Sequence, residues 1–303
     1  MASFHDFLRL VKIGIVGSNT LTALAGFALA AVGTRMPAGW NAAWGKGALL
    51  VTGTALLVGG SCALNNWMDR DIDALMERTR DRPTARGSMG ATTALTIGLG
   101  LAVAGLAVLL SLGPVPAALG LTGALVYLVA YTLMAKRRGA FSLYIGGIAG
   151  SVPPLIGWAV VDPRLGGPAW VLFAFLALWQ QAHVRSLALM RADEYHAAGV
   201  PMAGLSSTHG ASPTEAPGSA RVAVLVWVAV TLPLPSLAIV LAGQSLTGMP
   251  LAGVVGSCAL GAAWVIVGLV GFRSPAWPRL MFVASLAYLV LTFGGFAVVG
   301  ARP

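Results

Sequence analysis

Long apolar runs separated by short polar connections dominate the chain. The runs lack the alternation of apolar and polar side chains that a membrane β-barrel requires. Each approaches the ~20 residues that a helix needs to cross the hydrocarbon core of a bilayer. The pattern therefore predicts an all-α membrane protein with nine transmembrane helices. We expect these helices at about 14–33, 48–68, 91–112, 115–135, 141–161, 169–190, 221–242, 250–270 and 277–299.

The amino-acid composition agrees with a membrane location. Of the 303 residues, 57% are hydrophobic and 10% are charged, whereas a soluble domain carries roughly 25% charged residues. The net charge of +9 is weak evidence for a nucleic-acid partner, because basic residues in membrane proteins mainly set the orientation. We therefore expect a lipid bilayer as the partner and no nucleic acid.

The basic residues are distributed unevenly over the predicted connections. The N-terminus and the connections after the second, fourth, sixth and eighth helices hold fifteen Lys and Arg residues, and the opposite side holds four. The positive-inside rule then predicts a protein of the plasma membrane with a cytoplasmic N-terminus and an outer C-terminus. Three charged connections, at roughly 69–90, 136–140 and 185–220, share the cytoplasmic face. We expect the active site there, with 203–220 as either a lid or a simple connector.

An acidic motif follows the second predicted helix. Five of the ten acidic residues of the chain lie between Asp69 and Asp81. Asn65, Asp69 and Asp73 recur at every fourth position, so they project within about 80° of one helical face. Such oxygen ligands suit Mg²⁺, which prefers one or two carboxylates together with substrate phosphate oxygens. The spacing predicts a metal-bridged diphosphate, and a solvated loop of alternating charges is the simpler alternative.

Basic residues on the same face complete this prediction. Arg78 and Arg82 are four residues apart, and Lys136, Arg137 and Arg138 form a second cluster. Guanidinium groups bind phosphate oxygens through paired donors. Carboxylates, a metal ion and arginines together favour the departure of a diphosphate leaving group. Taken alone, the second cluster is more often a topology anchor.

A third polar stretch contains His183 and Glu194. They are eleven positions apart, which is about three helical turns, so both can share one face of a helix. Gln180 lies one turn before His183. Ionisable groups this close to a spanning segment usually face an interior cavity and mark a site. We expect a functional role for His183 and Glu194, against the alternative of an interfacial histidine capped by a loop.

These motifs resemble those of the UbiA family of intramembrane prenyltransferases. Asn65-x-x-x-Asp69-x-x-x-Asp73 is similar to the first acidic motif of that family, and the longer run to Pro83 resembles its haem O synthase branch. The last three predicted helices add little to this resemblance beyond their hydrophobicity. Three further stretches resemble the same branch: Val11–Val16 with Asn19, Lys136–Arg138 with Gly146–Trp158, and Trp179–His183 with Glu194–Met202.

The resemblance implies one transmembrane prenyltransferase domain over 1–303, with nine helices around a central cavity. It implies farnesyl diphosphate as the donor, haem B as the acceptor, haem O as the product and Mg²⁺ as the cofactor. By this resemblance the metal and diphosphate ligands are Asn65, Asp69 and Asp73 with the five basic residues above. His183 would contact the haem or assist a water molecule, and Glu194 would bind a second metal or orient His183.

Two alternatives remain open from the sequence. The residues around His183 depart from the usual Pro-His-Phe context of the branch, since Ala182 and Val184 flank it. This keeps open a UbiA-type transferase for a quinone precursor or lipid, or a terpene cyclase. A transporter or channel is the second alternative. It is disfavoured because the charged residues gather at one face, whereas a permeation path needs polar groups throughout.

Overall fold

The computed structural model describes residues 3–34, 39–135, 142–192, 218–242 and 248–300, and this part of the chain is helical without strands. The prediction of an all-α fold is therefore confirmed. The helices are α1 (Phe4–Leu10), α2 (Ile13–Thr34), α3 (Gly39–Met68), α4 (Arg70–Asp73), α5 (Ala91–Leu112), α6 (Pro114–Leu125), the π-helix η1 (Val126–Ala135), α7 (Ser142–Ser151), α8 (Pro153–Ala159), α9 (Gly167–Met190), α11 (Gly218–Thr231), α12 (Leu234–Leu241), α13 (Gly248–Val270) and α14 (Trp277–Gly300).

Each of the nine predicted segments lies on helix, but three are interrupted. The segment predicted at 115–135 changes from α-helix to π-helix at Val126. Prolines explain the other two breaks, because proline cannot donate the backbone hydrogen bond that continues a helix. Pro153 begins α8 after the end of α7, and Pro233 separates α11 from α12.

Seven helical stretches of the described chain are long and apolar enough to cross a membrane. Neither α7 nor α8 alone is long enough to cross a membrane. The second half of α9 carries Gln180, Gln181, His183 and Arg185. The protein is thus a multi-pass membrane protein, and the count of nine spans stays a prediction.

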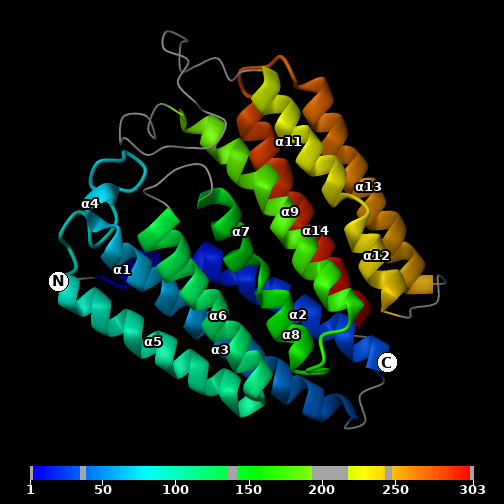
Figure 1. The fold of residues 1–303 in the computed structure, drawn as a ribbon, viewed down its shortest axis with the longest axis horizontal. Coiled ribbons are helices and arrows are strands. Elements are labelled where there is room, and N and C mark those ends of the chain that lie inside the picture. Colours follow the sequence, from blue (N-terminus) through cyan, green and yellow to red (C-terminus); the bar gives the residue numbers. More distant parts are fainter. Residues whose placement is uncertain (1–2, 35–38, 136–141, 193–217, 243–247, 301–303) are drawn as a thin grey trace.

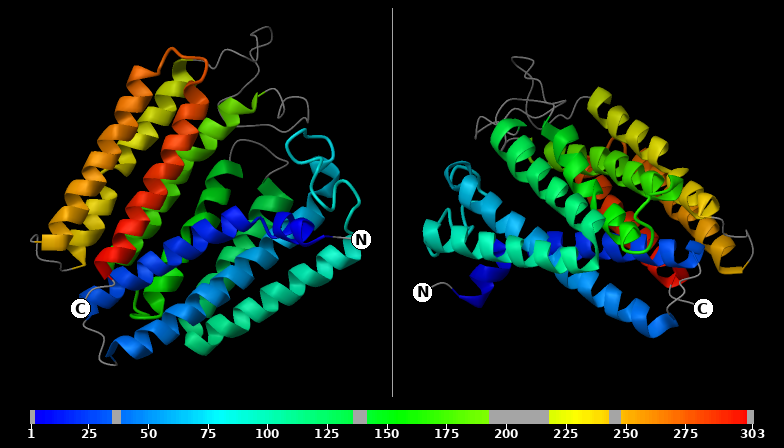
Figure 2. Two further views of the ribbon diagram at one scale, coloured as in Figure 1. Left: turned by 180° about the vertical axis from the view of Figure 1, so that it is seen from behind. Right: turned by 60° about the horizontal axis from the view of Figure 1, so that its bottom comes forward.

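The helices lie side by side across the molecule (Figure 1). α5 forms one edge, α13 forms the opposite edge, and α2, α7 and α8 lie between them, as the views in Figure 2 also show. Large apolar side chains cover the outer surface, for example Leu99 and Val103 of α5, which are 50% and 67% exposed. This surface suits lipid tails, which are as apolar as leucine.

Small residues bring the central helices into close contact. Gly157 of α8 packs directly on the backbone of α2, because a Cβ atom there would overlap the carbonyl oxygen of Ala23. Gly105 of α5 lies against Leu57 of α3 in the same manner. Helix pairs in membranes associate through such close backbone approach, since burial from lipid supplies little hydrophobic driving force. These contacts fix the walls around the cavity described below.

Candidate active site

The acidic motif lies on a continuous helical path from α3 into α4. The amide of Asp69 donates to the carbonyl of Asn65 at 2.9 Å, and that of Asp73 donates to the carbonyl of Asp69 at 2.8 Å. The three side chains are 3%, 0% and 2% exposed for Asn65, Asp69 and Asp73. Asn65 Nδ2 also donates to Asp69 Oδ2 at 2.8 Å. The structure therefore brings the three predicted ligands together as a buried row, not as a solvated loop.

Two cations of the protein contact this buried row. Arg82 Nη1 donates to Asp73 Oδ2 at 2.6 Å, as part of the predicted site. Lys12 Nζ donates to Asn65 Oδ1 at 2.5 Å and is a site residue that our sequence analysis missed. Its backbone has a φ of +53°, a strained conformation for a residue other than glycine. This break between α1 and α2 allows Lys12 to contact α3.

The π-helix η1 supplies a further polar contact. Thr132 Oγ1 donates to the carbonyl of Tyr127 at 2.8 Å, five residues earlier, as π-helical winding allows. The same oxygen accepts a hydrogen bond from Asn65 Nδ2 at 3.1 Å. π-Helical turns are rare and occur often at functional sites. Thr132 thus holds the amide group of Asn65 from the opposite side of the row.

The N-terminal segment holds the loop that follows α4. Arg86 forms an ion pair with Asp6, and Asn66 Nδ2 donates to the carbonyl of Leu10 at 2.8 Å. The backbone N–H of Ser3 and the Arg86 guanidinium lower the pKa of the Asp6 carboxyl below its ordinary value. Asp6 therefore stays ionised and keeps α1 against the loop that carries Arg82.

Arg78 is the remaining predicted cation of the site that lies within the described residues. Arg78 is exposed to solvent. Lys136, Arg137, Arg138 and Glu194 lie outside the residues that the structure describes, as does most of the predicted 203–220 loop. Their roles stay predictions.

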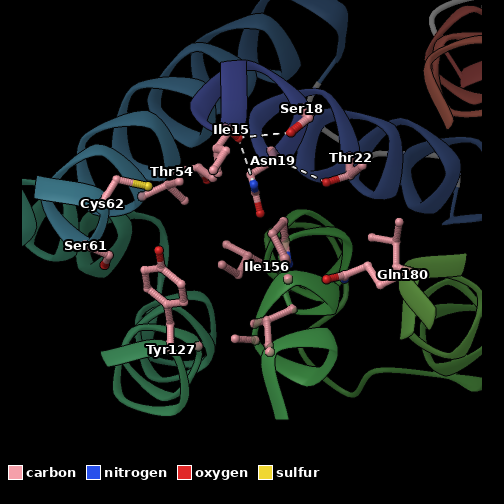
Figure 3. Close-up of a pocket in the computed structure, with 18 of the residues that line it drawn as sticks. Ile15, Ser18, Asn19, Thr22, Thr54, Ser61, Cys62, Tyr127, Ile156 and Gln180 are labelled. Carbon is pink, nitrogen blue, oxygen red and sulfur yellow. Dashed lines mark hydrogen bonds between the residues drawn. The ribbon is translucent and has the colours of Figure 1, made fainter. Parts of the chain in front are cut away.

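A cavity of about 620 Å³ lies between the helices near the acidic end of α3. This volume is typical of small-molecule sites. Cys62 lines the cavity one turn before Asn65, and His183 lines it from α9. Figure 3 shows Asn19, Tyr127 and Gln180 pointing into it from different helices. The polar residues on its α2–α3 wall are Ser18, Asn19, Thr22, Thr54 and Ser61.

Glycine makes room for this cavity on the α7 side. Gly146 and Gly150 both line it, and a Cβ atom at Gly150 would come within 2.7 Å of the Gln180 amide. Gln180 Nε2 instead donates to the carbonyl of Gly147 at 3.1 Å. α8 and α9 also contribute apolar side chains, with Ile156 and Leu176 among the lining residues. An apolar chain can therefore lie in the cavity beside the polar groups.

His183 lines the cavity from the second half of α9. Its ring stacks on Trp179, with centroids 4.7 Å apart, and on Phe282, with centroids 4.6 Å apart. His183 Nδ1 lies 2.7 Å from Ser285 Oγ of α14. His183 and Trp179 are among the residues that the sequence motifs indicate. Ser285 lies in an apolar helix, where no motif of the sequence marks it as a site residue.

The donor atoms of the acidic row fit a hard divalent cation. These ligand atoms are the oxygens of two carboxylates and one amide. This set suits Mg²⁺ when substrate phosphates supply further ligands. Within the described ranges, no group of three His, Cys, Asp or Glu side chains is placed to hold a metal ion by itself. The row is therefore suited to a metal ion that arrives with a phosphorylated substrate, not to a closed structural site.

A buried, oxygen-rich row next to a largely apolar cavity suits an enzyme that holds a polar head group at the membrane surface and its apolar chain inside. The model of the UbiA prenyltransferase family matches residues 19–286. The chain belongs to this family, and it is a prenyltransferase. The transporter alternative is thereby set aside.

Curated relatives give a more specific comparison within this family. The protoheme IX farnesyltransferase of Bacillus cereus (strain B4264) is 40% identical over 299 residues, which cover 97% of this chain and 92% of that protein. The protein of the same name from Bacillus anthracis (strain A0248) matches with the same identity and coverage.

Solved structures support the fold. An apo UbiA homolog from Aeropyrum pernix K1 matches with a TM-score of 0.70 at 19% identity, covering 92% of this chain and 97% of its own. A UbiA homolog from Archaeoglobus fulgidus bound to GPP and Mg²⁺ matches with a TM-score of 0.64 at 13% identity, covering 96% and 99%. At these identities the likeness concerns the fold alone.

Proposed function

We propose that the protein transfers a farnesyl group from farnesyl diphosphate to a vinyl group of haem B and forms haem O in an Mg²⁺-dependent reaction. The observation that carries this proposal is the buried row Asn65–Asp69–Asp73 beside a cavity that is lined by His183 and by Cys62, one turn before Asn65. The name of the relatives at 40% identity supports haem as the acceptor. The diphosphate of farnesyl diphosphate suits the acidic row, and its apolar chain suits the cavity.

The acidic row binds the diphosphate end of the donor. Asn65, Asp69 and Asp73 hold Mg²⁺, which supplies Lewis-acid stabilisation of the charge on the leaving group. Lys12 and Arg82, which contact the row, supply cations to the phosphate oxygens. The predicted cations Arg78, Lys136, Arg137 and Arg138 add to them from the cytoplasmic loops. Charged donors placed in a site with little water stabilise the departing diphosphate strongly.

The apolar middle of the cavity protects the reacting carbon. When the C1–O bond of the farnesyl diphosphate breaks, the positive charge spreads over the allylic carbons, and bulk water would quench it. Ile156 and Leu176 are among the side chains that keep this region dry. The vinyl carbon then bonds to C1, and one water molecule adds to the neighbouring carbon with loss of a proton. The product is a hydroxyethylfarnesyl side chain.

The orientation and extent of the enzyme follow as further parts of the proposal. We place the acidic end in the cytoplasm and the C-terminus outside, in the plasma membrane, because of the distribution of Lys and Arg. Residues 1–303 then act as one prenyltransferase domain. Glu194 follows α9 in the sequence and, by family resemblance, orients His183 or binds a second metal.

Product analysis tests the proposal directly. The purified protein, in detergent or liposomes, is incubated with labelled farnesyl diphosphate, Mg²⁺ and haem B, and the products are separated by chromatography. We expect labelled haem O and free diphosphate. Prenylation of a quinone precursor or lipid in preference to haem B, or a cyclic hydrocarbon formed without an acceptor, would replace the proposal with the corresponding alternative.

Lys12→Met is expected to lower kcat by about 10²–10³-fold, the range for removing one donor that stabilises developing charge. The methionine keeps a straight, flexible side chain and removes the ammonium group that contacts Asn65. Diphosphate release at saturating substrates measures the effect. Arg9→Met is the matched control, because Arg9 is an exposed cation on the same segment. Equal kcat values for the two variants would remove Lys12 from the diphosphate site.

A further inference from the structure

The imidazole of His183 is held on three sides. Trp179 and Phe282 stack on it with interplanar angles of 14° and 26°. Two near-parallel rings at these distances fit only on opposite faces of the imidazole, because on one face they would overlap each other. Ser285 Oγ occupies the Nδ1 side at 2.7 Å. Only the edge that carries Nε2 is left to meet the cavity that His183 lines.

The hydrogen bonds of Ser285 determine the tautomer of this ring. A serine hydroxyl has one proton to donate and two lone pairs to accept with. Ser285 Oγ donates its proton to the carbonyl of Phe282 at 2.6 Å. It can therefore only accept from His183, so Nδ1 carries the hydrogen and Nε2 keeps its lone pair. Ser285 itself is fully buried, and its carbonyl accepts from Trp179 Nε1 at 3.0 Å.

This arrangement has the form of a metal-binding histidine with its supporting group. Histidine ligands generally donate their second ring N–H to a neighbouring acceptor, which orients the ring and makes the ligating nitrogen more basic. The clamp of Trp179 and Phe282 further removes the rotational freedom that a free histidine would lose on binding. A general base that moves during catalysis needs no such rigid support, whereas an axial ligand benefits from it.

We propose that Ser285 is a positioning residue that fixes His183 in the Nδ1–H tautomer, so that Nε2 coordinates the iron of a porphyrin acceptor in the cavity. The inference rests on the proposed function, because it requires a haem acceptor. Coordination anchors the porphyrin at the α9–α14 end of the cavity. Its edge then extends through the cavity toward Tyr127 and toward Cys62, which lies one turn before Asn65 on α3.

Spectroscopy of the haem-loaded protein without prenyl diphosphate tests this proposal. Ferrous wild-type protein with haem B should show an iron–histidine stretching band in resonance Raman spectra. His183→Ala should remove the band, and added imidazole should restore an iron–imidazole signal. Ser285→Ala should shift the band to lower frequency or remove it, because Nδ1 loses its acceptor. It should also weaken haem affinity by about 10–100-fold.

Two matched variants separate this role from simple packing. Ser285→Thr retains the hydroxyl and should retain the band. Ser186→Ala removes a fully buried hydroxyl of α9 that, among the described residues, donates to the carbonyl of Ala182 at 2.7 Å, and it should leave the band unchanged. Size-exclusion elution of each variant reports folding. Haem that binds with a spectrum unaffected by His183→Ala or Ser285→Ala would overturn the inference, and wild-type protein that binds no haem would overturn the proposed function with it.

Discussion

Asp69→Asn is expected to lower Mg²⁺-dependent turnover by about 10³-fold or more while the protein remains folded. The Lewis-acid contribution of a bound metal ion amounts to several kcal/mol, and each ~1.4 kcal/mol corresponds to a tenfold change in rate. Asparagine has the shape of aspartate, and its amide oxygen can still accept the hydrogen bond that Asn65 donates at 2.8 Å. The variant therefore removes the charge and little else.

The neighbouring carboxylate Asp71 provides the control for this variant. It lies in α4, two residues after Asp69, and is exposed, whereas Asp69 is completely buried. Diphosphate release is measured against Mg²⁺ concentration for wild type, Asp69→Asn and Asp71→Asn. We expect Asp71→Asn to follow the wild-type curve. A wild-type curve for Asp69→Asn would contradict the metal site, and an equal loss in both variants would indicate a general effect of loop charge.

The order of helices could be predicted from the sequence because long apolar runs have few other interpretations. Residues 91–112, for example, were predicted as a span and are the bounds of α5 in the structure. The breaks within the predicted helices were harder to predict from the sequence. Pro153 marks one break by its chemistry, but nothing in the residues from Val126 onward indicates that the α-helix widens into a π-helix there. That change decides where Thr132 lies.

The candidate site likewise contains some contacts that the sequence predicts and others that it does not. The spacing of Asn65, Asp69 and Asp73 follows helical geometry, so a local pattern was sufficient to bring them together. Lys12 and Ser285 meet their partners across 53 and 102 positions of the chain. Such contacts depend on how the helices pack, which no local pattern contains. The sequence was therefore sufficient to place the three acidic-motif residues side by side, whereas the contacts around His183 could not be predicted from it.

Gly157→Ala is expected to destabilise the protein by about 3 kcal/mol, the upper end of the usual cost of overpacking a filled interior. The new methyl group would overlap the carbonyl oxygen of Ala23 and come within 2.8 Å of the backbone nitrogen of Phe27. Both contacts are with backbone atoms of α2, which cannot rotate away as a side chain can. α8 and α2 must therefore separate. The loss of folded protein is measured as a lower Tm in detergent by size-exclusion after heating.

Gly100→Ala is the control for this prediction. Gly100 lies within α5, and a Cβ atom there would have nothing within 4 Å. Alanine is also favoured over glycine in helix interiors, so we expect no loss of stability. A separation of α2 and α8 should also change the cavity, since Asn19 and Ile156 line it from these two helices. Gly157→Ala protein that remains folded at low temperature should thus show a raised KM for the acceptor. An unchanged Tm and KM would mean that α2 and α8 are less tightly packed than Gly157 indicates.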